Sequence, residues 1–546
     1  MPVGLTPLLK RPGGPAWRNS LVRGVAGPAV VVCVLGMSVA AHVAFSKVKA
    51  VDWIEMRNGR LVYGSDQYGN RIPDFSTAGY GGGGVPIPDI PVRASLDPVS
   101  GGDDTPRIQA ALEALVKQPA DANGFRGALL LHKGVYRIAG TILLNASGIV
   151  LRGEGSEEGG TVLVAQGGPH TVIRVGGSGE WQRAGAEHAI MDDYVPVGAN
   201  NIQVDDAREF HVGDRIVVEW KMTTAWIRAV GMDHIPPRKD GRAIYQWQPG
   251  MELRFDRRIL AVSGNRLTLD AALTNAMARG DGPTVWRYSF PGRIDHAGVE
   301  QLRSDGIAFE KSAGFANPDY LTEGDQPKFV GGGYFDALFV EYDAVEDAWM
   351  RNVAVTHYTR IAQVGQFARA ITIDGIAGDH VETEFTHAPP SAFGLDGQQT
   401  LVQHCDVSGA YSHVWMTQAR VAGPNVFRLC TAKGTRMDAG AHQRWATGTL
   451  YENLKIQGSI EIGNRSNKGT GHGWAGANSV LWNCEAATYL VESPPVAYNW
   501  AVGNVGSAER PQEGDPAGQI VSPGKHVEPG SLYDEQLRER LLGNGP

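Results

Sequence analysis

Hydrophobic residues along most of this chain come in short runs, each ending at a glycine or at polar residues. Residues 127–155, GALLLHKGVYRIAGTILLNASGIVLRGEG, are typical: strand, Gly, strand, Gly, strand, with no room for helices between them. Short apolar runs bounded by turn residues indicate β-strands. Strands this close together, each followed by a sharp turn, predict a chain that winds in coils around a core.

A short strand pattern recurs through the C-terminal half, which predicts a solenoid. It occurs at 400–405, 425–430, 449–454 and 479–484, and more loosely at 349–353 and 372–376. The closing residues Val353, Ile376, Cys405, Cys430, Leu454 and Cys484 are separated by 23, 29, 25, 24 and 30 positions. A period in the twenties with variable loops is typical of solenoids, whose equivalent positions stack. We therefore predict that the three cysteines form a buried ladder rather than a metal site, because free Cys packs as a small hydrophobe.

Both ends of this region carry a predicted helix. Asp103–Gln109 opens a helix with Thr105 as N-cap and Pro106 as the first helical residue. Its residues 108, 112 and 115 are apolar and lie on one face. The C-terminal SLYDEQLRERLL has Ser531 as N-cap, and Tyr533, Leu537 and Leu541 form one stripe. This helix is expected to cap the open end of the solenoid or to dock on its side.

Residues 191–283 interrupt the coil pattern with longer alternating strands. One pair is joined at Gly264-Asn265, as in a two-residue hairpin. We interpret the segment as an inserted small β-domain. Its residues Trp220, Trp226 and Trp247 either platform sugars or fill its core, and we favour the core.

The first fifty residues indicate export. Residues 24–45 contain no charged residue, and only basic charges, at Lys10, Arg11, Arg18 and Arg23, precede them. Basic charge before an apolar run keeps the N-terminus in the cytoplasm and sends the downstream chain across the membrane. The run suits a signal peptide or a membrane anchor, and cleavage is left open. We expect the rest of the chain to be periplasmic, at the cell surface or extracellular.

Composition excludes several other classes of protein. The 546 residues carry a net charge of −8, with a pI of about 6.0, so the basic footprint of a nucleic-acid-binding protein is missing. Four cysteines in this length do not make a disulfide scaffold. The 71 glycines have no G-x-y period, which excludes collagen and fits many tight turns.

GDDTPRIQAALEAL, followed by residues 127–155, resembles the opening of the pectate lyase superfamily. The resemblance implies a right-handed parallel β-helix with an N-terminal capping helix, and it covers about residues 70–505 without the insertion. Members include polysaccharide lyases, glycoside hydrolases, isomerising enzymes and phage tailspikes, so the fold does not choose the chemistry. We thus predict an all-β chain with these parts: 1–23 basic n-region, 24–45 signal or anchor, 70–190 N-terminal β-helix, 191–283 inserted domain, 284–505 C-terminal β-helix, and 506–546 polar tail and terminal helix.

Three loops about one coil apart carry the candidate chemistry. They are residues 438–445, 464–474 and 492–500. The segment 402–474 contains eight Lys or Arg residues but only four Asp or Glu residues. A locally basic wall on an acidic protein suits an anionic polymer. We predict that these loops line one lateral groove, with His442, Arg444, Arg465, Lys468 and His472 as catalytic residues. The predicted substrate-binding residues are Trp445, Trp474, Asn464, Asn499 and Trp500.

These residue types fit β-elimination of a uronate. That reaction needs a cation to neutralise the substrate carboxylate and a base, such as His, Lys or Arg, to take the C5 proton. The sequence does not distribute these roles among the five residues. In many relatives calcium neutralises the carboxylate, and Asp374, Asp379 and Asp396, with Glu382 and Glu384, would be its oxygen ligands here.

Two alternatives remain open at this point. A glycoside hydrolase needs paired carboxylates, for which Asp438 with Glu461 or Asp374 with Asp396 are available. Gly471-His472-Gly473 also matches one short motif of polygalacturonase-like hydrolases, although the companion motifs are absent. The other alternative is a non-catalytic glycan-binding or adhesive β-helix. The sequence thus predicts an exported, monomeric polysaccharide lyase, membrane-bound if residues 24–45 are uncleaved, without nucleic-acid partners.

Overall fold

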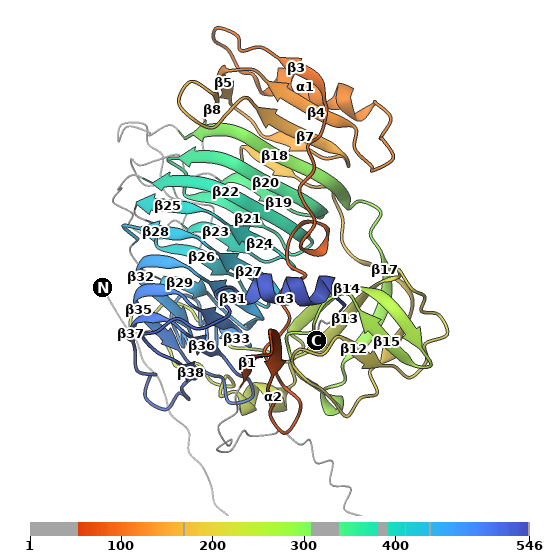
Figure 1. Cartoon of the computed structure of the whole chain (residues 1–546), viewed down its shortest axis with the longest axis vertical. Helices are drawn as coiled ribbons and strands as arrows, with labels where there is room; N and C mark the ends of the chain where they lie inside the picture. The colour runs from red at the N-terminus through yellow and green to blue at the C-terminus, as the bar shows by residue number, and fades with distance from the viewer. Residues whose placement is uncertain are drawn as a thin grey trace, which may run out of the picture. The chain divides into compact units, whose positions relative to one another are not determined.

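The computed structural model describes residues 53–543, apart from 168–169, 307–337, 381–390, 410 and 436–437. Its main feature is a 26-stranded sheet whose strands stack coil upon coil (Figure 1). Within the described residues, no helix is long and apolar enough to cross a membrane. The predicted export segment 24–45 lies outside them.

The strands of successive coils pair in parallel, in the register that the sequence repeat predicts. Leu401 of β24 (Leu401–Gln403) pairs with Val426, and Val426 pairs with Leu450. The next coil continues the row, because Leu450 pairs with Val480. Parallel strands joined by such connections wind in the right-handed sense. The chain is a right-handed parallel β-helix, as predicted.

The coils form three faces. Face 1 contains β3 (Val92–Leu96), β4 (Gly127–Leu131), β7 (Ile149–Gly153), β24, β27 (Asn425–Arg428), β31 (Thr449–Glu452), β34 (Val480–Trp482), β36 (Trp500–Val502) and β38 (Gln519–Val521). Face 2 contains β5 (Gly134–Ile138), β8 (Thr161–Ala165), β25 (Asp406–Gly409), β28 (Thr431–Lys433) and β37 (Val505–Ala508). Face 3 contains β6 (Ile142–Leu144), β9 (Ile173–Val175), β19 (Leu338–Tyr342), β21 (Arg360–Val364), β23 (Ser391–Leu395), β26 (His413–Thr417) and β29 (Asp438–Ala441).

Five longer strands bend from one face into the next. Three of them cross from face 1 to face 2: β18 (Ile294–Asp305), β20 (Val345–Thr356) and β22 (Arg369–His380). The other two cross from face 2 to face 3: β32 (Lys455–Ile462) and β35 (Glu485–Val491). The short strands β30 (Ala446–Thr447) and β33 (Gly476–Ala477) pair in the loops that lead back to face 1. The solenoid therefore continues to Val521, beyond residue 505, where the sequence pattern predicted its end.

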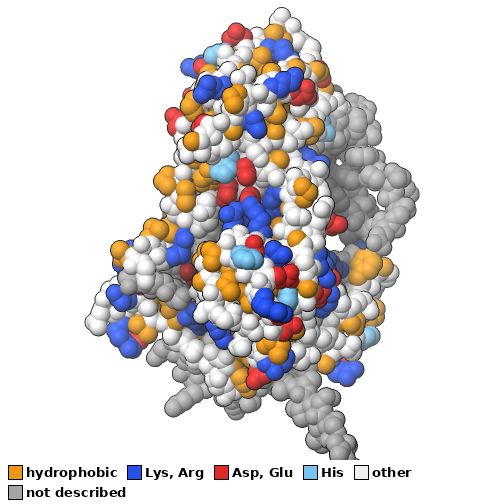
Figure 2. Space-filling view, turned by 90° about the vertical axis from the view of Figure 1, so that its right-hand side faces the viewer, with side chains coloured by type: hydrophobic (Ala, Val, Ile, Leu, Met, Phe, Trp, Pro, Cys, Tyr) orange, Lys and Arg blue, Asp and Glu red, His pale blue; other side chains and the backbone are white. Residues whose placement is uncertain are grey.

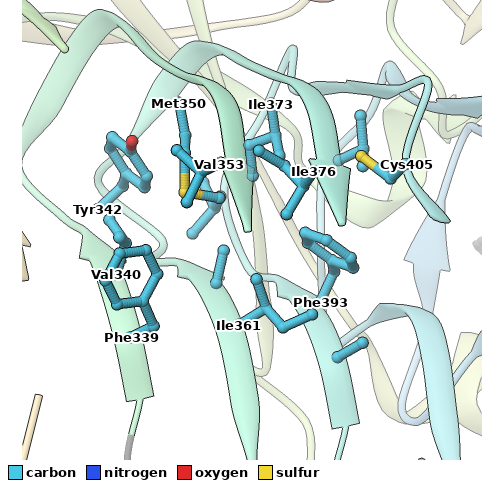
Figure 3. Packing of buried hydrophobic residues seen from close by; sticks show 14 of the residues in the cluster. Phe339, Val340, Tyr342, Met350, Val353, Ile361, Ile373, Ile376, Phe393 and Cys405 are labelled. Carbon is cyan, nitrogen blue, oxygen red and sulfur yellow. The ribbon is translucent and has the colours of Figure 1, made fainter. Parts of the chain in front are cut away.

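The interior is lined by the stacked residues that the repeat identified. Cys405, Cys430, Leu454 and Cys484 are each at most 2% exposed and belong to one hydrophobic cluster. The three cysteines are free thiols, so the predicted buried ladder is confirmed. In Figure 3, Val353, Ile376 and Cys405 lie in one row that faces Ile361 and Phe393 of face 3.

A helix packs over the first coils. The α1 helix (Thr105–Val116) buries the three apolar residues of its predicted face, Ile108, Leu112 and Leu115. The predicted cap is one residue off: Asp104 precedes the helix, and Thr105 is its first residue. Asp103 accepts the Thr105 N–H at 2.9 Å, which explains why the helix begins one residue earlier.

Between β9 and β18 the chain leaves the coils and forms an antiparallel six-stranded sheet. Its strands are β10 (Gln182–Ala189), β12 (Asn201–Gln203), β13 (Arg215–Lys221), β14 (Glu252–Ser263), β15 (Arg266–Leu269) and β17 (Thr284–Ser289). This insert also contains α2 (Thr224–Ala229), the pair β11 (Tyr194–Val195) and β16 (Met277–Ala278), and the short helix η2 (Arg279–Asp281). The sheet extends beyond both ends of the predicted range 191–283. Trp220, Trp226 and Trp247 are at most 6% exposed, so they fill a core, as favoured.

Buried ion pairs join the insert to the solenoid. Arg369 of β22 lies 3.1 Å from Asp256 and 2.7 Å from Asp270, both in the insert. Arg215 of β13 binds Glu346 of β20 through two contacts. Figure 2 views the side from which the insert projects, and charged side chains of both signs gather there in a hollow.

The outer side of face 1 is covered by the two ends of the described chain. The hairpin β1 (Ile54–Arg57) and β2 (Arg60–Tyr63), the short helix η1 (Tyr80–Gly82) and α3 (Leu532–Leu541) lie over it. The α3 helix therefore docks on the side of the solenoid, and Ser531 caps it as predicted, accepting the Asp534 N–H. Leu541 is 68% exposed, however, and Gln536 and Glu539 are buried in its place because they bind the N-terminal segment.

Candidate functional site

Four predicted catalytic residues come together on face 3. His442 follows β29, and Arg465 and His472 lie in the loop after β32, one coil further on. The rings of His442 and His472 lie 4.6 Å apart, edge to face. Lys468 from the same loop lies 3.9 Å from Glu461 of β32. The one-coil spacing in the sequence thus becomes side-chain proximity in the structure.

A buried carboxylate, Asp438, lies at the base of this group. Its Oδ1 lies 2.7 Å from His413 Nδ1, and Arg465 contacts its Oδ2. Burial alone would raise the pKa of Asp438, but His413 and Arg465 outweigh it and hold the pKa below its ordinary value. His413 also stacks near His442, with ring centroids 4.8 Å apart. Both oxygens of the carboxylate are therefore engaged.

The two histidines above Asp438 are neutral. Burial, reinforced by electrostatic effects of His413, His472 and Arg465, lowers the pKa of His442 well below its usual value. Burial, followed by the charges of Arg465 and Arg444, lowers the pKa of His472 to about 3. Both imidazoles are thus free of a second proton at neutral pH and able to accept one.

Glu461 adds an acid to the group. Burial and then the nearby charge of Asp438 raise its pKa above the ordinary value. Two carboxyl groups whose pKa values are pushed apart are typical of acid–base sites. Arg444 lies at the edge of this group: its N–H donates to the His472 carbonyl at 3.0 Å, while its guanidinium donates to the carbonyl oxygen of Thr470 at 2.9 Å and lies over the Tyr245 ring. Arg444 therefore fastens the loop to the insert.

The predicted tryptophan platform is wrong. Trp445 and Trp474 are each 1% exposed and belong to the hydrophobic core of the insert. Trp445 packs against Trp226 at 4.6 Å and donates to Asn275, and Trp474 donates to the Val230 carbonyl at 2.9 Å. They are buried because the insert folds over the loops that carry them.

The third tryptophan and one asparagine are also interior residues. Trp500 is fully buried on face 1, where the N-terminal segment and α3 cover it. Asn499 is fully buried and binds the main chain at Gly476 and Glu492, so it holds a turn. Asn464 is half-buried beside Arg465, and its side chain lies 3.3 Å from Asp515. Of the five predicted sugar contacts, only Asn464 remains near the cluster.

Three of the acids suggested as calcium ligands are not brought together, and the other two, Glu382 and Glu384, lie outside the described residues. Asp374 lies on face 1 and binds Gln403 and His404, whereas Asp379 lies on face 2 and binds Ser408. Asp396 follows β23 on face 3. The three acids therefore lie on three different faces. Strand β22 bends at Gly375, which lies between Asp374 and Asp379 and places them on different faces. Across the described ranges, no three His, Cys, Asp or Glu side chains are arranged to hold a metal ion.

His413 is a member of the cluster that was not predicted from the sequence. It lies in the strand HVWMT, all of whose residues are buried, and nothing in the strand itself distinguishes it from a core residue. A signal was nevertheless present, because His413, Asp438 and Glu461 are separated by 25 and 23 positions, one coil each. Aligning the face 3 strands in the way the face 1 repeat was aligned would have placed His413 beside Asp438.

Comparison with known proteins identifies no family. No protein-family profile matches the chain, and no curated protein sequence matches it. Similarity is found among solved structures.

Phage tailspikes are among the similar structures. The tailspike gp49 of Pseudomonas phage LKA1 is 14% identical, with a TM-score of 0.43 over 77% of this chain and 70% of that one. The tailspike of E. coli bacteriophage HK620, solved with a pentasaccharide, is 10% identical, with a TM-score of 0.39 over 76% of this chain and 57% of that one. Similarity at this level carries no conclusion about the function of this chain.

Proposed function

We propose that this chain is an exported member of the pectate lyase superfamily that cleaves a uronate-containing polysaccharide by β-elimination at face 3. One observation carries the proposal: two neutral imidazoles, His442 and His472, lie together beside the cations Arg465 and Lys468. A base next to positive charge is what removal of a proton beside a carboxylate requires.

The described side chains divide the steps of the reaction among them. Lys468, whose side chain is 58% exposed, pairs with the uronate carboxylate and stabilises the negative charge that develops. His442, half-buried at the edge of the cluster, takes the C5 proton. The electron pair forms the C4–C5 double bond while the C4–O4 bond breaks. Glu461, whose pKa burial raises, donates the proton that the leaving O4 needs.

Arg465 and Asp438 are positioning residues in this scheme. Arg465 is 6% exposed and bound to Asp438, so its charge acts on its neighbours rather than on the substrate. That charge contributes to keeping both His442 and His472 unprotonated. The pair therefore maintains the base in its active form.

The engaged state of Asp438 favours elimination over hydrolysis. A glycosidase needs two carboxyl groups free to act across the scissile bond. Both oxygens of Asp438 are occupied by His413 and Arg465, which leaves Glu461, 3.9 Å from Lys468, as the more available of these two carboxyl groups. The other suggested pair, Asp374 with Asp396, lies on two different faces.

The test is product chemistry on a panel of uronic-acid and neutral glycans. Elimination gives an unsaturated product with a new absorbance near the ultraviolet edge. His442→Gln and Lys468→Ala should each lower the rate by about 10²–10⁴-fold. The matched controls His211→Gln and Lys455→Ala change exposed residues elsewhere and should stay within about threefold of the wild-type rate, below either magnitude.

Each other outcome overturns the proposal. New reducing ends without the absorbance mean a hydrolase. Binding of a glycan without any product means a non-catalytic binder. Full activity in both variants means that the reaction takes place elsewhere on the chain.

A further inference from the structure

A polar cavity, separate from the cluster around Asp438, lies between the insert and face 3. It has a volume of about 90 Å³, and its main lining residues are Trp181, Arg254, Gln366, Asp396, Gln398 and Arg420. Gln398 fastens the two parts together, because its amide donates to the Arg254 carbonyl at 2.9 Å and accepts the Asp256 N–H. The cavity is therefore a feature of the junction that the insert creates.

The cavity is aligned with His442 along the solenoid. Leu395 pairs with Thr417, and Thr417 pairs with Ala441. The residues after them, Asp396, Gln418 and His442, thus occupy equivalent positions in three successive coils. Strands lie about 4.7–4.9 Å apart, which places Asp396 roughly 10 Å from His442. Gln418 lies in the coil between them, and its Oε1 is 3.5 Å from His442 Nδ1.

Arg420 is an available cation in this cavity. It is exposed, and within the part of the chain that the structure describes no side chain pairs with its guanidinium. Arg254, by contrast, is bound to Glu219 at 2.7 Å and to Glu252 at 2.6 Å. An unpaired guanidinium matches a carboxylate in geometry and charge. Arg420 therefore suits an anionic ligand group.

The other walls suit a sugar ring. Trp181 is half-buried and fixed by its Nε1–H bond to Asp256 at 3.2 Å and by edge contact with Phe367. Asp396 accepts from Gln363 at 2.6 Å, and burial raises its pKa to about 7. A carboxyl that is partly protonated at neutral pH donates as well as accepts a hydrogen bond. The cavity thus combines a flat apolar surface, a donor and a cation.

We propose that this cavity is a second sugar subsite, in which Arg420 pairs with the carboxylate of a uronate about two residues along the chain from the sugar at His442. The inference rests on the proposed function and adds to it a role for the insert, which contributes Trp181 and Arg254. A polysaccharide lying along the solenoid axis passes both places, because one coil and one pyranose residue advance by similar distances.

The experiment compares oligouronates of increasing length, from disaccharide to hexasaccharide, on the full chain. Arg420→Gln should raise KM about tenfold for the longer oligomers, the loss of one charge pair of about 1.4 kcal/mol. It should leave kcat and the KM of the disaccharide unchanged within about twofold. Arg420→Lys keeps the charge and should recover most of the loss. Arg208→Gln, at an exposed arginine of the insert, is the matched control.

A binding measurement separates this proposal from the proposed function. In the His442→Gln background, hexauronate should bind more tightly than a neutral hexasaccharide, and Arg420→Gln should reduce the difference about tenfold, leaving the part that Lys468 contributes. If the wild-type chain neither cleaves nor binds any uronate, the proposed function fails. If the wild type is active and Arg420→Gln matches it at every length, only the subsite is overturned. An equal loss of kcat at all lengths also overturns it, because Arg420 then acts at the reacting sugar.

Discussion

His413 Nδ1 lies 2.7 Å from one oxygen of Asp438, while Arg465, from the next coil, contacts the other. The three side chains are all at most 9% exposed. His413 and Arg465 therefore share a single buried carboxylate, that of Asp438, as their partner. Removal of one partner from a buried ion pair costs far more than the pair contributes, because it leaves an uncompensated charge.

Asp438→Asn should therefore lower the free energy of unfolding by about 3–5 kcal/mol. It should also reduce turnover, because Arg465 and His413 lose the group that positions them. Denaturant titration measures the first effect. The double variant Asp438→Asn/Arg465→Gln should recover part of the stability, with a coupling of about 0.5–3 kcal/mol. A loss below about 1 kcal/mol in the single variant would contradict this role of Asp438 at the base of the site.

Gly448 tests how the insert is seated. Its φ is +64°, and a Cβ there would lie 2.2 Å from Thr274 of the insert. Gly448→Ala should cost about 2–4 kcal/mol, since it combines overpacking with an unfavourable backbone conformation. Gly213 has a φ of +91° but open space around it, so Gly213→Ala should cost only about 1–2 kcal/mol. Equal melting temperatures for the two variants would mean that Thr274 moves aside at little cost and that this contact does not fix the insert.

The cysteine ladder predicts slow thiol chemistry. Cys405, Cys430 and Cys484 are at most 2% exposed, and burial raises the pKa of Cys484 to about 12. In a Cys33→Ser background, the native protein should react with a thiol reagent far more slowly than the denatured one. Cys430→Ser places a hydroxyl in the same apolar row and should cost about 1–3 kcal/mol. Labelling of native and denatured protein at the same rate would refute the ladder.

Much of the fold was predictable because the solenoid repeats one pattern. The recurring segment that ends in Cys405, Cys430, Leu454 and Cys484 indicated the strand register, since stacked coils place equivalent residues at one position. The same stacking brings His442 near Arg465 and His472. Local periodicity was enough wherever neighbouring coils make the contact.

The errors lie where distant segments cover the coils. Trp445 and Trp474 are buried by the insert, and Trp500 is buried by residues from both ends of the chain. No period in the sequence reports such contacts, because they join the coils to segments that are not part of the repeat. Leu541 was misassigned for a related reason, since the polar Gln536 and Glu539 found partners in the N-terminal segment.

His472 gives the stability of this protein a defined dependence on pH. Burial, followed by the charges of Arg465 and Arg444, lowers its pKa to about 3 in the folded state, against an ordinary value near 6.5. Below pH 6.5 His472 therefore binds a proton in the unfolded chain that it does not bind in the folded chain. The free energy of unfolding should fall as the pH drops from about 6.5 towards 3 and should be unaffected by this group above that window. At pH 4.5 His472 lowers the free energy of unfolding by roughly 2–3 kcal/mol.

His472→Gln should remove this contribution, so the variant should lose less stability than the wild type between pH 7.5 and 4.5. His211→Gln, at an exposed position, should retain the wild-type loss. Denaturant titrations at the two pH values measure the difference, and parallel losses in the wild type and His472→Gln would show that His472 is protonated in the folded protein.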